Sequence, residues 1–133
     1  MRPLLSLPAA CLLAFAGGSA LADWTAVGNP DEIYAAYAEP ASIRRNGGMV
    51  TMAGLYDFRR QDFTPEGRGL YSTVVLREYD CLARRVRLLS SIDFAGHMGA
   101  GDPVSTSQTP RRWEPVHEAG IDREFLRFAC APK

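Results

Sequence analysis

The chain has 133 residues, enough for one ordinary domain but not for two. Its 15 basic and 15 acidic side chains balance, which excludes the strong positive charge that draws proteins to nucleic acid. Its three cysteines and two histidines include no close ligand pair of the C-x-x-C kind that zinc sites use. We therefore expect no nucleic-acid partner, no metal and no cofactor.

The first residues have the layout of a secretory signal peptide. Met1 and Arg2 give a positive start, and the apolar run LLSLPAACLLAFA follows. The run is shorter than the roughly 20 residues that span a bilayer. Small residues at Ala20 and Ala22 then form a cleavage site before Asp23. The alternative, a buried N-terminal helix, fits this ending less well.

This layout predicts a signal peptide over residues 1–22, cleaved between Ala22 and Asp23, and a single domain over residues 23–133. Cleavage removes one basic residue and no acid, leaving 14 basic and 15 acidic side chains. No second apolar run is long enough to span a membrane. We expect an exported protein, in the periplasm or at the cell surface.

The domain begins with segments in which apolar and polar residues alternate, as in strands of a half-buried sheet. Asn46-Gly47 marks a turn within residues 40–48, and the polar stretch RRQDFTPEGRG (59–69) is expected to be a loop. The expected strands are DWTAVG (23–28), EIYAAYA (32–38), MVTMAGLYDF (49–58), LYSTVVLREYDC (70–81) and RRVRLLSSIDF (84–94), with short ones near Val104 and in RRWEPV (111–116).

The C-terminal segment changes from strand to helix periodicity. Ile121, Phe125 and Phe128 recur at helical spacing, Asp122 is a candidate cap, and Pro132 prevents continuation. A short helix with one apolar stripe has to pack against a sheet face. The sequence thus predicts an α+β fold, an antiparallel sheet of about six strands with one C-terminal helix packed on it.

Cys81 and Cys130 are the two cysteines of the predicted mature chain, and three roles compete for them. A thiol nucleophile needs a base, for which His97 and His117 are candidates, but both lie in loop-like sequence without a catalytic-cysteine signature. A metal site lacks paired ligands. An even cysteine count in a small exported domain favours a disulfide, which would tie the helix to the sheet.

The charges around Cys81 predict a strand register. If residues 81–84 form a four-residue hairpin loop, Asp80 faces Arg85 and Glu78 faces Arg87 as cross-strand ion pairs. Tyr79 then lies on the other face, together with Cys81, and that face should be covered by the helix. We expect these two acids to fix the strand register and not to act in catalysis, since the sequence implies no cleft beside them.

Four Arg-Arg pairs suggest polyanion binding, at residues 44–45, 59–60, 84–85 and 111–112. The simpler interpretation is a general use of arginine in place of lysine, with 14 Arg and one Lys in the chain. Adjacent residues on a strand also point to opposite faces, so a pair is not by itself a patch.

Taken together, several motifs make the chain similar to one family of exported proteins. They are Trp24, EPASIRRNGG (39–48), LYDF (55–58), YSTVVLREYDC (71–81), RRVRLL (84–89), Trp113 and a helix that ends in Cys130. In this order and spacing the chain resembles the surface-adhesin protein E family of proteobacteria. The resemblance implies an antiparallel sheet of about six strands with a C-terminal helix, tied by the Cys81–Cys130 pair.

Two positions depart from the pattern that the resemblance implies. Glu39 stands where an aspartate is expected before Pro40, which is a conservative change. Glu118-Ala119-Gly120 replaces the Pro-Gly-Ser expected before the helix, which makes Asp122 the candidate cap.

The leading hypothesis for function is an exported, non-enzymatic binding domain. The resemblance implies an adhesin, and a named member of the family binds host matrix proteins such as laminin and vitronectin. The expected partner is an extracellular-matrix or envelope protein, and the sequence also leaves room for a homodimer. The alternatives are a small hydrolase that depends on Cys81, His97 or His117, and a periplasmic structural factor. Fold-level resemblance does not decide among them.

Overall fold

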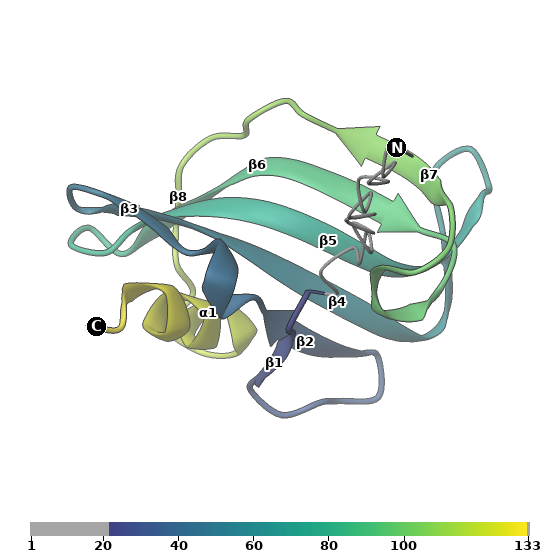
Figure 1. Cartoon of the computed structure of the whole chain (residues 1–133), viewed down its shortest axis with the longest axis horizontal. Coiled ribbons are helices and arrows are strands. Elements are labelled where there is room, and N and C mark those ends of the chain that lie inside the picture. Colours follow the sequence, from purple (N-terminus) through teal and green to yellow (C-terminus); the bar gives the residue numbers. More distant parts are fainter. Residues whose placement is uncertain (1–21, 133) are drawn as a thin grey trace, which may run out of the picture.

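The structure, a computed structural model, describes residues 22–132. It confirms the expected α+β fold, a single antiparallel sheet with one C-terminal helix (Figure 1). The expected signal peptide lies outside the described residues, apart from Ala22. The strands are β1 (Thr25–Val27), β2 (Tyr34–Ala38), β3 (Arg44–Asn46), β4 (Met49–Phe63), β5 (Gly69–Asp80), β6 (Arg85–Phe94), β7 (Pro103–Ser107) and β8 (Glu114–Pro115), and the helix is α1 (Ile121–Cys130).

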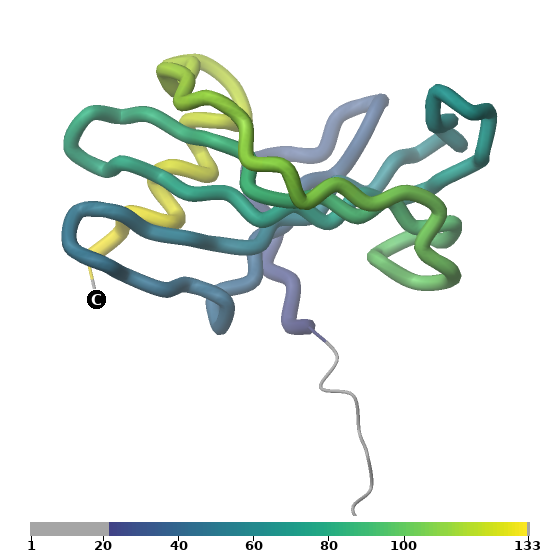
Figure 2. Tube along the Cα trace, turned by 90° about the horizontal axis from the view of Figure 1, so that it is seen from above, coloured from purple at the N-terminus to yellow at the C-terminus, as the bar shows by residue number. Residues whose placement is uncertain are grey.

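The sheet is built on three long central strands, β4, β5 and β6. Its main order is β1-β2-β4-β5-β6-β7. On the side away from β5, β4 pairs with β3 near its start and with β2 further along. On its side away from β5, β6 likewise pairs with β8 near its start and with β7 further along. The two hairpin tips, residues 47–48 and 81–84, therefore project at one end of the molecule, near the C terminus (Figure 2).

The strand β4 is longer than the sequence predicts, because residues 59–63 continue it instead of forming a loop. Asp62 pairs with Leu70 and Phe63 with Gly69, after an irregularity in register that begins at Asp57. All five side chains of this extension are exposed, so its charged residues are not buried by joining the strand. A charged sequence is compatible with a strand wherever both faces meet water.

Residues 40–48 form more structure than the expected turn. A 3₁₀ turn (Pro40–Ser42) is followed by β3, and a two-residue turn at Gly47-Gly48 leads into β4. Gly47 has φ +62°, the left-handed conformation that such tight hairpin turns require.

The main core lies between one sheet face and α1. Phe125, Leu126 and Ala129 are fully buried and pack among residues of β4 and β5, including Met52 and Tyr79. Burying a phenylalanine or leucine side chain contributes about 1.5–3 kcal/mol, and isolated helices of this length are marginal in water. Packing against the sheet is therefore what stabilises α1.

The start of α1 corrects a prediction. The residue before the helix is Gly120, with φ +91°, and no side chain caps it. Asp122 lies inside the first turn and is not the cap. Its carboxylate can still interact favourably with the positive end of the helix dipole. The left-handed backbone at position 120 explains why glycine, and not a capping side chain, ends the loop.

The opposite sheet face has a smaller apolar area under the loop after β6. Ser72 is fully buried, and its hydroxyl donates to the carbonyl of Gly96 at 2.7 Å and accepts from the amide of Gly99 at 2.8 Å. Leu55, also fully buried, lies close to Gly99. This loop, with its 3₁₀ turn at His97–Gly99, thus covers the part of the second face around Leu55 and Ser72.

Candidate functional site

The two cysteines of the domain form a disulfide. Cys81 and Cys130 are bonded, with their Cα atoms 5.8 Å apart, which confirms the expected tie between sheet and helix. The bond joins the β5–β6 hairpin tip to the last residue of α1. Both sulfurs are used in it, so Cys81 has no thiolate of the kind that a cysteine hydrolase needs.

The charges beside Cys81 are paired across the hairpin. Asp80 lies opposite Arg85 in the register, with Oδ2 and the guanidinium 2.9 Å apart, and Glu78 lies opposite Arg87 at 2.7 Å. Asp80 also accepts from the amide of Ala83 at 3.0 Å. The hydrogen bond from Arg85, followed by that from Ala83, lowers the pKa of the Asp80 carboxyl. These residues organise a four-residue loop.

Further polar contacts anchor the segments around α1. Arg84 makes two hydrogen bonds of 2.7 Å to the carboxylate of Glu118, just before the helix. Arg45 on β3 donates to the carbonyls of Ala129 and Ala131 at the helix end. Two of the four arginine pairs thus have members that hold structure at this end of the sheet.

Trp113 lies against two of the ion-paired arginines, a contact that the sequence analysis missed. The guanidinium carbons of Arg85 and Arg87 lie 5.2 Å and 4.9 Å from its ring centroid. Cation–π contacts of this kind contribute about 0.5–1 kcal/mol at exposed sites. Arginines two apart on a strand share a face, but no local spacing relates Arg85 and Arg87 to a tryptophan 28 and 26 residues further along the chain.

Arg77 lies under α1, among aromatic side chains. It donates to the Tyr56 hydroxyl at 2.6 Å, and its guanidinium carbon lies 5.8 Å from the Phe125 ring centroid. Burial raises the pKa of the neighbouring Tyr79 to about 12. Burial also acts against the charge of Arg77, but the neighbouring tyrosines outweigh it and raise the pKa of Arg77 overall.

The two candidate catalytic histidines are not brought to Cys81 as a catalytic group. His97 follows the last residues of β6, whereas the 81–84 hairpin precedes the first residue of that strand. The Nδ1 atom of His97 lies 3.1 Å from Asp57, and its ring is tilted by 40° against that of Tyr71. His117 is exposed in the loop before α1. Because Cys81 is in a disulfide, neither histidine has a thiol to activate there.

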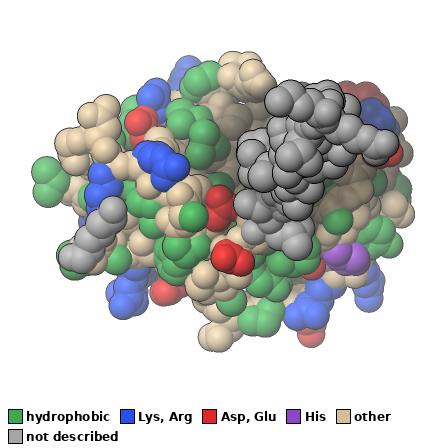
Figure 3. Space-filling view, viewed as in Figure 1, with side chains coloured by type: hydrophobic (Ala, Val, Ile, Leu, Met, Phe, Trp, Pro, Cys, Tyr) green, Lys and Arg blue, Asp and Glu red, His purple; other side chains and the backbone are tan. Residues whose placement is uncertain are grey.

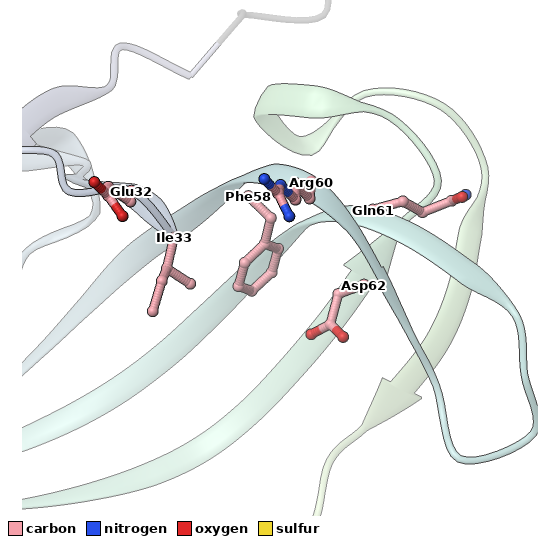
Figure 4. A pocket seen from close by; sticks show the side chains of 6 residues that line it. All are labelled: Glu32, Ile33, Phe58, Arg60, Gln61 and Asp62. Carbon is pink, nitrogen blue, oxygen red and sulfur yellow. The ribbon is translucent and has the colours of Figure 1, made fainter.

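An open depression lies at the junction of the β1–β2 loop and the outer part of β4. Its volume is about 450 Å³, and Glu32, Ile33, Phe58, Arg60, Gln61 and Asp62 line it. Figure 4 shows the side chains of Ile33 and Phe58 pointing the same way, with Asp62 beyond Phe58. Ile33 is 65% exposed, which is unusual for an isoleucine. We call these six residues the Ile33 depression.

The backbone holds Ile33 in place. The Asp31 carboxylate accepts from the amides of Ile33 at 2.7 Å and Tyr34 at 2.9 Å, and these hydrogen bonds lower its pKa. The carbonyl of Ile33 accepts from the amide of Arg59 at 3.0 Å. The ring of Phe58 is arranged edge-to-face with that of Tyr34, with the ring centroids 6.5 Å apart. The apolar pair is thus presented on an ordered backbone.

This arrangement suits contact with another macromolecule better than small-molecule chemistry. The depression is open, and its apolar centre is rimmed by two acids and an arginine, as in protein interfaces with a polar rim. Charges of both signs are interspersed on the described part of the face in Figure 3. Sequence reasoning missed the depression because Ile33 and Phe58 lie 25 positions apart and meet only through strand pairing.

Comparison with a family model identifies the family of this chain. The model of surface-adhesin protein E matches residues 24–131, and the chain belongs to that family. The family suggests a surface-adhesin-like binding role and an exported or cell-surface location. Among residues 22–132, no helix is long and apolar enough to cross a membrane.

Solved structures of protein E share the fold. The chain is similar to Haemophilus influenzae protein E with 12% identity and a TM-score of 0.65, over 81% of this chain and 83% of that one. Protein E from non-typeable Haemophilus influenzae matches with 12% identity and a TM-score of 0.61, over 80% and 75%. A search of curated proteins finds no significant match.

Proposed function

We propose that this protein is an exported, non-enzymatic binding domain that attaches to a host-matrix or envelope protein through the Ile33 depression. The observation that carries the proposal is the exposed Ile33 beside Phe58, held by backbone hydrogen bonds within a charged rim. Membership of a surface-adhesin family supports a role in attachment.

Binding through the exposed Ile33 and the half-buried Phe58 beside it follows from simple energetics. Burying apolar surface contributes about 25 cal/mol per Å², and a well-placed apolar anchor commonly dominates an interface. An anchor whose backbone is already ordered loses little conformational freedom on binding. The acidic and basic rim then selects the partner by charge.

Saturation binding of the purified protein tests the function. Immobilised laminin, immobilised vitronectin and immobilised bacterial envelope protein serve as three separate probes, with immobilised albumin as the control. We expect saturable binding to at least one probe that excess unlabelled protein displaces. Linear, non-displaceable signals on all three would overturn the proposal.

Export is the second part of the proposal. We propose cleavage between Ala22 and Asp23, on the basis of the small residues that precede the site. N-terminal sequencing of protein recovered from the periplasm or the cell surface should begin at Asp23. Recovery of a chain that retains Leu4 would contradict it.

Self-association is a further partner hypothesis that the sequence left open. Sedimentation of the purified protein over a range of concentrations tests it. A homodimer predicts a mass that rises with concentration toward twice that of one chain, whereas a constant monomer mass removes the hypothesis.

A further inference from the structure

A second depression lies between the edge of β6 and the start of α1. Its volume is about 210 Å³, and four arginines line it, Arg77, Arg87, Arg111 and Arg112. The apolar side chains of Val86 and Leu88 also face it. We call it the arginine cavity. It lies apart from the Ile33 depression, with which it shares no lining residue.

Three of these arginines are not neutralised by an ion pair. Among residues 22–132, the arginines with a carboxylate within 4.0 Å are Arg84, Arg85, Arg87 and Arg127. Arg77, Arg111 and Arg112 thus bring three positive charges to the cavity. Two carboxylates also line it, those of Glu114 and Asp122, so the local balance remains positive.

The cavity is held by its neighbours. The amide of Arg111 donates to the carbonyl of Leu88 at 2.8 Å, which fixes the segment against β6. Arg87 is stacked on Trp113 and paired with Glu78, and Arg77 is oriented by the Tyr56 hydroxyl. The half-buried guanidinium of Arg77 is therefore positioned before any ligand arrives. A preorganised charge in a partly desolvated site interacts more strongly with an anion than one on an open surface.

We propose that the arginine cavity binds a carboxylate side chain of an acidic peptide segment in the protein partner. A guanidinium is planar and donates two parallel hydrogen bonds, which matches the two oxygens of a carboxylate. The space equals that of about seven waters at roughly 30 Å³ each, enough for one glutamate side chain. Val86 and Leu88 can contact its methylene groups.

The surroundings favour a single anionic side chain over a long polyanion. A sulfated glycan needs a continuous basic track, but the flanking Arg84 and Arg85 are occupied by Glu118 and Asp80. The two acids in the cavity also repel dense negative charge. The inference rests on the proposed protein-binding function and adds a second contact to it.

Titration followed by amide NMR of the purified protein tests the inference. The probe is the peptide acetyl-Gly-Glu-Gly-Glu-Gly-Glu-amide at low salt, with its Gln counterpart as control. We expect saturable shifts at the amides of Leu88, Arg111 and Asp122 with the Glu peptide alone. Absent or non-saturable shifts, or equal shifts with the Gln peptide, would overturn the inference.

Amino-acid substitutions test whether the peptide binds at the arginine cavity. Replacing the exposed pair by Arg111→Gln and Arg112→Gln should weaken peptide binding at least about tenfold, the loss expected for charge-assisted hydrogen bonds. The matched double variant Arg123→Gln with Arg127→Gln, two exposed arginines of α1 that line neither depression, should bind as wild type. Asp122→Asn removes a competing carboxylate and should tighten binding about fivefold. Equal weakening in both double variants would overturn the inference.

A heparin-derived sulfated disaccharide serves as the competing probe. Saturable shifts with the disaccharide and none with the Glu peptide would overturn the acidic-peptide assignment. Saturable binding to laminin, vitronectin or envelope protein would still stand if the peptide titration failed, so the two proposals can fail separately.

Discussion

Gly54 lies against the Cε1 and Cζ atoms of the Phe125 ring. A Cβ atom at position 54 would stand 3.1 Å from Cε1 of Phe125 and 3.3 Å from Cγ2 of Val75. The helix can therefore approach β4 this closely because position 54 has no side chain. This contact joins the centre of the sheet to the most buried aromatic residue of α1.

Replacing Gly54 with alanine should destabilise the protein by about 1–3 kcal/mol, the usual cost of overpacking a core. The Phe125 ring and the Val75 methyl would both have to shift. Urea denaturation measures the change. Gly48→Ala is the control, because a Cβ there meets nothing within 4 Å, and it should change stability far less. Equal stability of Gly54→Ala and wild type would show that the helix can move at no cost.

Removing the disulfide should lower stability by about 2–5 kcal/mol, measured on the double variant Cys81→Ala with Cys130→Ala. The sheet should keep its circular dichroism, whereas hydrogen exchange of the α1 amides should accelerate first. Reduced wild-type protein should behave like the double variant. An unchanged melting temperature would contradict the structural role, and loss of an activity without loss of stability would indicate a reactive cysteine instead.

The unfolding free energy should fall as the pH drops below about 5. The pKa of Asp80 is lowered from 3.8, mainly by its hydrogen bond with Arg85, and that of Glu118 is lowered from 4.5, mainly by Arg84. In the window between folded and unfolded pKa values, the unfolded chain binds more protons, so stability rises with pH there. The stabilisation is fully present at pH values above the pKa values of the unfolded chain. It is lost as the pH falls through the lower pKa values of the folded chain.

Asp80→Asn should flatten part of this acid dependence, measured by denaturation between pH 2 and pH 6. Asp102→Asn, at an exposed carboxylate without an ion pair among residues 22–132, is the control and should leave the profile as in wild type. If Asp80→Asn kept the full acid dependence, the Asp80–Arg85 pair would not contribute to it.

The hairpin at residues 81–84 shows what local sequence can predict. Asp80 and Glu78 precede the loop, and Arg85 and Arg87 follow it at matching distances, so opposite charges and loop length point to one register. The helix was predictable from its apolar spacing, whereas its first residue was not. Gly120 takes a left-handed backbone that no side-chain pattern indicates.

The outer part of β4 and both depressions depend on contacts between distant segments. Residues 59–63 have the charges of a loop, and only their pairing with β5 makes them strand. The alternating sequence predicts a strand that includes Ile33, whereas its exposure follows from the turn that Asp31 holds before β2. The predicted register already puts Arg77 on the face that α1 covers, whereas the approach of Arg111 and Arg112 to the same cavity depends on the fold.

The most direct test of binding through the Ile33 depression is a measurement of the affinity of the Ile33→Asp variant. The ligand is whichever of laminin, vitronectin and envelope protein binds the wild-type protein saturably. Leu82→Asp is the matched control, because Leu82 is 91% exposed on the distant hairpin tip. We predict that Ile33→Asp weakens binding at least about tenfold, since a buried apolar anchor contributes 2 kcal/mol or more, while Leu82→Asp binds as wild type. Undiminished binding by Ile33→Asp, with both variants folded, would contradict the proposal.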